Sequence, residues 1–308
     1  MSLAGKKILI TGATGQVAGP IAHTLARNNE VWCIARFTKP DSRAALEARG
    51  IKTVLCDIGT GEFGDVPREF THVIHSAVDV YGTDFDAALR VNAEGTGLLM
   101  THCRQAEAFL HISSCGVYRD HPDPLHAYKE TDPLGGYALY APTYSVAKIG
   151  AETVVRTLAR QLGLRSTIAR LNVAYGTAGH GGVPVQHFAT MLRGKAIPVL
   201  RGRPNYCSPI HEDDLVAHVA PFLAAASVPA TIVNWGGDEA VTDVEFCRYL
   251  GELAGIEPRF EESDHAFNSF ITDNTRRREL AGPCRVHWRD GMRRVIAARF
   301  PNVRLRST

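Results

Sequence analysis

The stretch "ILITGATGQVAG", residues 8–19, places glycines directly after the first apolar run of the chain. Gly12 permits a sharp turn, and Gly15 lets the backbone approach a ligand closely. The helix expected next points its N-terminal amides and the positive end of its dipole at this loop. The same glycines would also serve a tight strand-to-helix turn without a ligand. Because the spacing is G-x-x-G-x-x-A, ending at Ala18, the loop predicts a cradle for the pyrophosphate of a dinucleotide.

Short β-rich runs alternate with segments of helical spacing through the first half of the chain. This alternation predicts an α/β Rossmann fold, a doubly wound parallel sheet covered by helices on both faces. We expect the nucleotide-binding domain to cover residues 1–170, with 206–237 returning to it, and a smaller, interleaved C-terminal substrate lobe to comprise 171–205 and 238–308. The expected strands are Lys7–Thr11, Glu30–Ala35, Lys52–Cys56, His72–Ser76, Phe109–Ser113, Arg165–Leu171 and Thr231–Asn234.

Composition narrows the class of protein. A net charge of +2 does not favour nucleic acid as a partner. The seven cysteines are scattered and form no C-x-x-C pair, which favours reduced thiols in a cytoplasmic protein over a disulfide framework or a zinc site. No apolar run resembles a signal peptide or a membrane span. We therefore expect a cytoplasmic protein with a small-molecule substrate, no membrane partner and no metal.

The second predicted strand ends in Arg36 rather than in an acidic residue. An acid at this position would bind the ribose 2′-hydroxyl of NAD, whereas a guanidinium suits the 2′-phosphate of NADP. Lys39 and Arg43 follow and add positive charge. The alternative is that Arg36 merely faces solvent at a strand end. The sequence thus favours NADP, with NAD as the alternative cofactor.

Tyr144 stands four residues before Lys148 in "APTYSVAK", so the two share one face of a helix. A nearby ammonium stabilises the phenolate and lowers the tyrosine pKa from its usual value of about 10. Such a pair passes a proton to or from a substrate oxygen while hydride moves at the attached carbon. Ser113 and Ser114 end a predicted strand and offer a second group to polarise that oxygen.

These motifs, in their order along the chain, resemble an extended short-chain dehydrogenase/reductase of the NAD(P)-dependent epimerase/dehydratase family. TGATGQVA resembles the nucleotide loop of that family, and CDI, with Asp57 and Ile58, resembles its adenine contact. HSA, with Ser76 and Ala77, resembles the segment behind the cofactor, and VNAEGT, with Asn92, the central helix motif. SSCGVY, Y-x-x-x-K and PIHEDDL follow, so the resemblance spans nearly the whole chain.

The resemblance implies that Tyr144 is the catalytic acid/base, that Lys148 binds the nicotinamide ribose, and that Ser114 orients the substrate oxygen. It also implies a homodimer formed through two helices of each chain, here 86–105 and 143–161. Residues expected to contact the cofactor are Gly12, Thr14, Gly15, Gln16, Val17, Arg36, Asp57, Ile58, Ser76, Ala77, Asn92, Tyr144, Lys148, Leu171 and Val173. Weaker candidates for substrate contact are Val80, Tyr81, Cys115, Tyr175 and Arg203.

Two departures from the family bear on the substrate. Its nucleotide-sugar members carry an asparagine where Val173 stands and an arginine where Cys207 stands, and both normally grip a diphosphate. Arg201 or Arg203 is a candidate replacement from the preceding loop. We therefore expect an NADP-dependent oxidoreductase that interconverts a carbonyl and a hydroxyl on a non-nucleotide substrate. The alternative is a nucleotide-sugar epimerase or dehydratase with a tightly bound cofactor. A cofactor-sensing protein without turnover is disfavoured, because the tyrosine and the lysine are both present.

Overall fold

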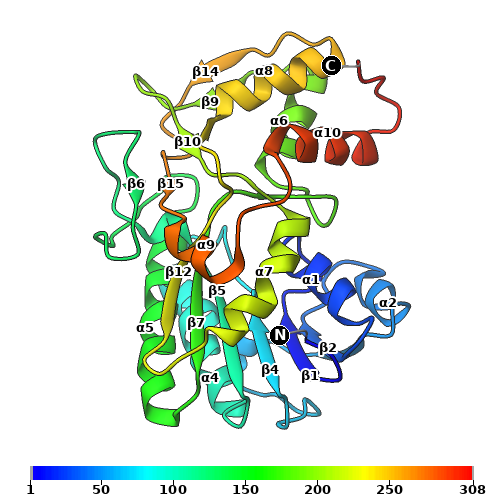
Figure 1. Ribbon diagram of the computed structural model, residues 1–308, viewed down its shortest axis with the longest axis vertical. Coiled ribbons are helices and arrows are strands. Elements are labelled where there is room, and N and C mark those ends of the chain that lie inside the picture. The colour runs from blue at the N-terminus through cyan, green and yellow to red at the C-terminus, as the bar shows by residue number, and fades with distance from the viewer. Residues whose placement is uncertain (1–2, 307–308) are drawn as a thin grey trace.

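A seven-stranded parallel sheet is the centre of the larger part of the computed structural model, which describes residues 3–306 (Figure 1). The strand order is β12-β7-β5-β4-β1-β2-β3. The strand order reverses between β1 and β4, and the carboxyl ends of such strands open the crevice in which doubly wound folds bind ligands. The strands are β1 (Lys7–Thr11), β2 (Glu30–Ala35), β3 (Lys52–Leu55), β4 (His72–His75), β5 (Ala108–Ser114), β7 (Ser166–Leu171) and β12 (Thr231–Trp235).

Helices cover both faces of the sheet because each face is apolar. On one face, Leu99 and Val155 from two helices join Phe109 of β5 in a buried core. On the other face, Ile21 and Phe222 join the residues of β1, β5 and β12. The helices and turns of this part are α1 (Ala18–Leu25), α2 (Ser42–Glu47), η1 (Ile58–Thr60), α3 (Phe85–Leu89), the π-helical η2 (Arg90–Glu94), α4 (Gly95–His102), η3 (Cys115–Val117), α5 (Tyr144–Leu162), α7 (Glu212–Ala224) and α9 (Thr275–Ala281).

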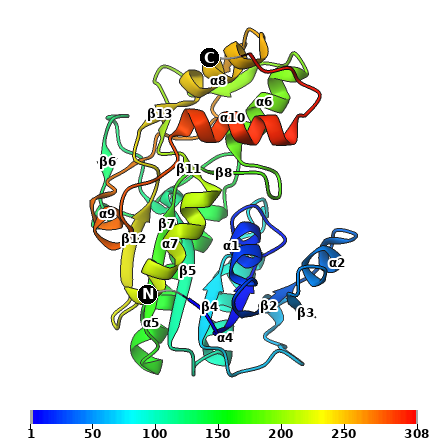
Figure 2. The ribbon, with the colours of Figure 1, turned by 45° about the vertical axis from the view of Figure 1, so that its right-hand side comes forward.

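A smaller lobe lies beyond one end of the sheet, at the top of Figures 1 and 2. Its core packs Phe188, Phe246 and Met292 from three helices. These are α6 (Val183–Leu192), α8 (Asp243–Ala254) and α10 (Trp288–Arg299). Short strand pairs complete it and connect it to the sheet: β8 (Ala174–Tyr175) with β11 (Ile210–His211), β9 (Ile197–Val199) with β14 (Phe260–Glu262), β10 (Tyr206–Cys207) with β13 (Val241–Thr242), and β6 (Ala127–Tyr128) with β15 (Ile271–Thr272).

The doubly wound parallel sheet predicted from the sequence is confirmed, and its seven expected strands lie within a residue or two of the observed ones. The proposed domain limits stay a prediction, and two details refine them. Helix α9 belongs to the range 238–308 but packs against α7 and β12 beside the sheet. Strand β10 belongs to the range 206–237 but pairs with β13 in the lobe. Among residues 3–306, no helix is long and apolar enough to cross a membrane.

Candidate active site

A cavity of about 560 Å³ extends from the loop after β1 to the small lobe. It lies at the carboxyl edge of the sheet, where the fold is expected to bind its ligands. Four residues predicted for the site do not line it: Asn92, Lys148, Tyr175 and Arg203. The predicted residues that do line it are Gly12, Thr14, Gly15, Gln16, Val17, Arg36, Asp57, Ile58, Ser76, Ala77, Val80, Tyr81, Ser114, Cys115, Tyr144, Leu171 and Val173.

The loop after β1 needs glycine at position 12. Gly12 has a φ of +75°, and a Cβ added to it would lie 2.9 Å from the backbone nitrogen of Ala77. The N–H of Gly15 donates back to the carbonyl of Gly12 at 2.9 Å, which closes the turn. Helix α1 begins directly after Val17, whose side chain cannot cap the free N–H groups of the first turn. The positive end of the helix dipole therefore faces the loop without a side-chain cap, as an anion-binding site requires.

A buried chain of hydrogen bonds supports this loop from behind. The Thr96 hydroxyl donates to the Asn92 carbonyl at 2.5 Å, so its oxygen accepts from Nε2 of His75 at 2.8 Å. Nδ1 of His75 then accepts from the Thr11 hydroxyl at 2.7 Å. Burial lowers the pKa of His75 to about 3, which keeps the ring neutral. The Thr11 oxygen in turn accepts the N–H groups of the next two residues, Ser76 and Ala77, which line the cavity.

Asn92 acts indirectly, which corrects its predicted role as a cofactor contact. Its Oδ1 accepts the N–H of Asp79 at 2.8 Å, and its Nδ2 donates to the carbonyl of the same residue at 3.0 Å. The side chain is buried in the π-helical turn η2 and does not reach the cavity. It therefore fixes the backbone that carries Val80 and Tyr81, both of which line the cavity.

The tip of β2 presents positive charge to one end of the cavity. Arg36 and Lys39 are exposed and line it, and the structure shows no hydrogen bond or ion pair from either side chain to any residue between 3 and 306. Asp57 follows β3 and caps η1 by accepting the N–H of Gly59 at 3.0 Å. One carboxylate and two cations thus surround this end, which suits the adenosine part of a dinucleotide.

Tyr144 and Ser114 meet at the wall of the cavity. Ser114 ends β5 and accepts the N–H of Gly116 at 3.1 Å, while Tyr144 begins α5. The neighbouring Ser113 instead donates to Glu152 at 2.6 Å in the interior, so Ser114 is the serine that faces the site. Burial raises the pKa of Tyr144 to about 12, although the Ser114 hydroxyl lowers it in part.

Lys148 is buried one helical turn behind Tyr144, and its Nζ donates to the carbonyl of Ile112 at 2.8 Å. Burial lowers the pKa of Lys148 to about 8, against the opposing charge of Glu152. Burial raises the pKa of Tyr144 by more than the Ser114 hydroxyl lowers it, so the lowering expected from Lys148 stays a prediction.

The two remaining corrections concern the substrate. Tyr175 is buried in the lobe, where its hydroxyl donates to the carbonyl of Trp288 at 3.4 Å. Arg203 pairs with Asp120 and with the carbonyl of His121, away from the cavity. Arg201 is exposed and pairs with two lobe carboxylates. Neither arginine therefore replaces the cation that is missing at Cys207.

Several lining residues escaped the sequence prediction because they come from loops and lobe elements without a recognisable motif. They supply aromatic surface and uncharged polar groups, with one carboxylate. They are Phe37, Tyr137, Tyr140, His180, Gln186, Asn205, Tyr206, Asp243, Phe267, Asn268 and Phe270. Only the loop ranges around 119–140 and 176–205, between predicted elements, pointed toward some of them.

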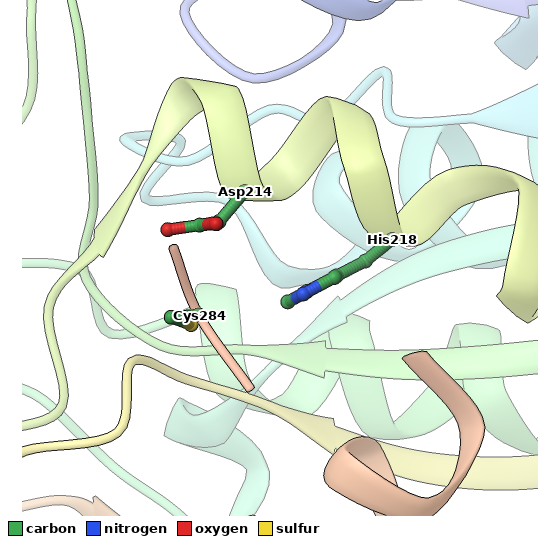
Figure 3. A group of neighbouring side chains, drawn as sticks. All are labelled: Asp214, His218 and Cys284. Atoms are coloured by element: carbon green, nitrogen blue, oxygen red, sulfur yellow. The ribbon is translucent and has the colours of Figure 1, made fainter. Parts of the chain in front are cut away.

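Asp214, His218 and Cys284 also converge, with potential ligand atoms within 4.8 Å of one another (Figure 3). Their hydrogen bonds argue against a metal site. Both Asp214 oxygens accept backbone N–H groups of the 285–286 segment. Nδ1 of His218 accepts the indole N–H of Trp235 at 3.2 Å, so the neutral ring carries its proton on Nε2 and has no lone pair left. The trio instead joins α7 to the segment before α10.

The chain is similar to curated proteins that are named for reactions of UDP-glucose and dTDP-glucose. A trifunctional UDP-glucose 4,6-dehydratase/UDP-4-keto-6-deoxy-D-glucose 3,5-epimerase/UDP-4-keto-L-rhamnose-reductase from Arabidopsis thaliana is 25% identical over 317 residues, which cover 94% of this chain and 46% of that protein. The chain thus spans about half the length of this relative. A dTDP-glucose 4,6-dehydratase from Mycolicibacterium smegmatis is 27% identical over 281 residues, covering 84% of this chain and 80% of the relative.

Solved structures share the fold at low identity. A UDP-glucose 4-epimerase from Thermotoga maritima with UDP-glucose has a TM-score of 0.81 at 20% identity, covering 96% of this chain and 98% of the other. A UDP-glucuronic acid 4-epimerase from Bacillus cereus, in complex with UDP-glucuronic acid and NAD, has a TM-score of 0.79 at 20% identity, covering 93% and 96%. The model of one family matches residues 8–236. The chain belongs to the NAD dependent epimerase/dehydratase family, as its ordered motifs predicted.

Proposed function

We propose that this protein interconverts a hydroxyl and a carbonyl group on a small molecule, with Tyr144 as the acid/base. The observation that carries the proposal is that Tyr144 and Ser114 line the same cavity as the glycine loop. A bound nicotinamide cofactor supplies or accepts the hydride. With a pKa raised to about 12, the phenol is protonated at neutral pH and is ready to donate to a carbonyl oxygen. Ser114 orients that oxygen. Lys148 stays the candidate for the cofactor ribose that the family resemblance implies, although its Nζ donates to the carbonyl of Ile112 behind the cavity wall.

The relatives favour a nucleotide sugar over the non-nucleotide substrate expected from the sequence. The curated relatives are named for UDP-glucose or dTDP-glucose dehydration, and the two solved structures hold UDP-sugars. The first candidate is therefore an epimerase or dehydratase, in which the cofactor is reduced and reoxidised within one turnover.

One observation favours the second candidate, net oxidation or reduction of a substrate without a diphosphate. Val173 and Cys207 stand where the family's nucleotide-sugar members carry groups that grip the diphosphate. In the structure these positions present an apolar side chain and a thiol to the cavity. Arg201 and Arg203, the candidate replacements, are paired elsewhere.

We propose NAD as the cofactor, because the family is named for NAD and the Bacillus cereus epimerase was solved with NAD bound. NADP is the alternative. Arg36 and Lys39 support NADP, because two unpaired cations at the tip of β2 suit a 2′-phosphate. Arg36→Glu separates the two: it should weaken NADP binding by an order of magnitude or more and spare NAD. Equal losses for both cofactors would remove the case for NADP.

The experiment that tests the function follows cofactor and product together. The purified protein is assayed for bound nicotinamide, then mixed with UDP-glucose, dTDP-glucose and a panel of simple ketones and alcohols. Absorbance of the reduced nicotinamide and chromatography of the sugars are both recorded. Sugar conversion without net change in absorbance indicates the epimerase or dehydratase, and net consumption of reduced cofactor indicates the reductase. Turnover of no compound in the panel would count against the enzymatic proposal.

A further inference from the structure

The charged side chains that line the cavity are divided between its two ends. Arg36, Lys39 and Asp57 lie at the ends of β2 and β3, where the adenosine part of a cofactor is expected. In the half of the cavity formed by the lobe, Asp243 is the one Asp, Glu, Lys or Arg among the lining residues of the range 3–306. The substrate half therefore carries net negative charge, although the family's nucleotide-sugar members act on anionic substrates.

Asp243 is built into this wall rather than left mobile. It is the first residue of α8, follows the N-cap Thr242, and is buried. Its Oδ2 accepts from Nδ2 of Asn205 at 2.6 Å and lies 3.5 Å from Nε2 of His187. Its Oδ1 has no hydrogen-bond partner in the described part of the chain. A buried carboxylate with a free oxygen on a cavity can only accept hydrogen bonds, so it calls for a donor from the ligand.

Apart from the imidazole of His187, the neighbours described for Asp243 are uncharged. Cys207 lies beside it, and burial together with the Asp243 carboxylate raises the pKa of this thiol, so the thiol stays neutral. Asn205 and Tyr206 are uncharged and complete this part of the wall. A phosphate placed here would meet a carboxylate in a partly desolvated site, where Asp243 forms no ion pair with a lysine or an arginine of residues 3–306, and this is unfavourable.

We infer that Asp243 determines substrate specificity by accepting hydrogen bonds from a hydroxyl or ammonium group of the substrate and by repelling phosphate. The inference rests on the proposed function, because it names the chemistry of the substrate part remote from the reacting carbon. The inference therefore favours the second candidate of the proposed function, a substrate without a diphosphate.

The repulsion is tested by calorimetric titration of the NAD-saturated protein with uridine and with UDP. The wild type should bind UDP no more tightly than uridine, and Asp243→Asn should improve UDP binding relative to uridine by ~10-fold or more. Asp264→Asn is the matched control, because Asp264 is an exposed lobe carboxylate that pairs with Arg201 outside the cavity. Asp243→Ser, which keeps an acceptor for Asn205, replaces the first variant if that does not fold. Wild-type binding of UDP far more tightly than uridine, or no gain in either Asp243 variant, would overturn the inference.

The attraction is tested by kinetics with whichever compound of the panel is turned over. Asp243→Asn should raise KM ~10-fold or more and leave kcat within a factor of a few, since Asp243 contacts no reacting atom. An unchanged KM would refute this role while the proposed function stands. A wild type that turns over nothing would refute the proposed function, and the binding experiment would still decide the role of Asp243.

Discussion

Tyr144 is the proposed acid/base, and its surroundings determine whether its phenol is protonated at neutral pH. Burial raises its pKa to about 12, so the phenol holds its proton at neutral pH. Tyr144→Phe should lower kcat by ~10²-fold or more, because the variant cannot exchange a proton with the substrate oxygen. Cofactor binding and thermal stability should change little. Tyr137→Phe, on the exposed rim of the same cavity, is the control. Full activity in the Tyr144 variant would point to a cofactor-binding protein without this chemistry.

His111 is expected to lower the free energy of unfolding by itself. It is buried in β5, and neither ring nitrogen has a hydrogen-bond partner within residues 3–306. Because an unsatisfied buried polar group costs ~1–3 kcal/mol, His111→Leu should raise the free energy of unfolding by ~1 kcal/mol. Urea titration at pH 7.5 measures this.

A buried histidine with partners provides the contrast. Nε2 of His102 lies 3.0 Å from the carbonyl of Pro67, and its ring stacks on Phe63. His102→Leu should therefore destabilise the protein. If both variants lose stability equally, an ordered water or another partner must satisfy His111.

At the scale of elements, the turn between β1 and α1 is the most constrained segment. Gly12→Ala forces a side chain into positive φ and against the backbone of Ala77. We expect it to weaken cofactor binding by ~10-fold or more and to lower stability by ~1–2 kcal/mol. Gly50→Ala is a matched control, because Gly50 also has a φ of +75° but has nothing within 4 Å of its would-be Cβ. Fluorescence titration with the reduced cofactor compares the two. Equal cofactor affinities would show that the close approach to Ala77 does not matter.

Local sequence patterns predicted the elements well where local chemistry decides the structure. The period of the apolar runs and the glycine spacing depend on neighbouring residues, and they predicted the sheet and the first loop. The sequence did not predict that three of the expected site residues lie outside the cavity, because tertiary partners decide where their side chains go. Asn92 binds the backbone of Asp79, Tyr175 that of Trp288, and Arg203 pairs with Asp120.

The part of the cavity lined by Asn205 and Asp243 could not be predicted from the sequence for the same reason. Asn205 and Asp243 lie 38 residues apart and meet only when β10 pairs with β13. No spacing rule connects two such positions, and neither belongs to a motif. The pKa of Tyr144 also depends on how deeply the folded chain buries the phenol, which the lysine one helical turn away does not reveal.

At the scale of the whole molecule, the homodimer stays a prediction. The apolar side chains of Leu98 on α4 and Val146 on α5 are exposed, at 41% and 40%. Two copies that pair these helices would cover both side chains. Light scattering after size exclusion should give twice the mass of 33.5 kDa, and Leu98→Asp should shift the protein toward monomer. A wild-type monomer at high concentration would exclude this assembly.

The stability of the whole molecule should fall steeply in mild acid because of its buried histidines. Burial lowers the pKa of His75 to about 3 and that of His218 to about 4, and it holds the pKa of His111 well below its usual value. Below the ordinary histidine pKa of ~6.5, the unfolded chain binds protons that the folded chain refuses. The free energy of unfolding therefore decreases as the pH falls from about 6.5 toward these folded-state values, by up to ~1.4 kcal/mol per pH unit for each histidine. Urea titrations at pH 7.5, 6 and 5 measure the slope, and His111→Leu should make it shallower by one histidine's share. A stability that is flat from pH 7.5 to 5 would mean that these rings gain protons in the folded protein.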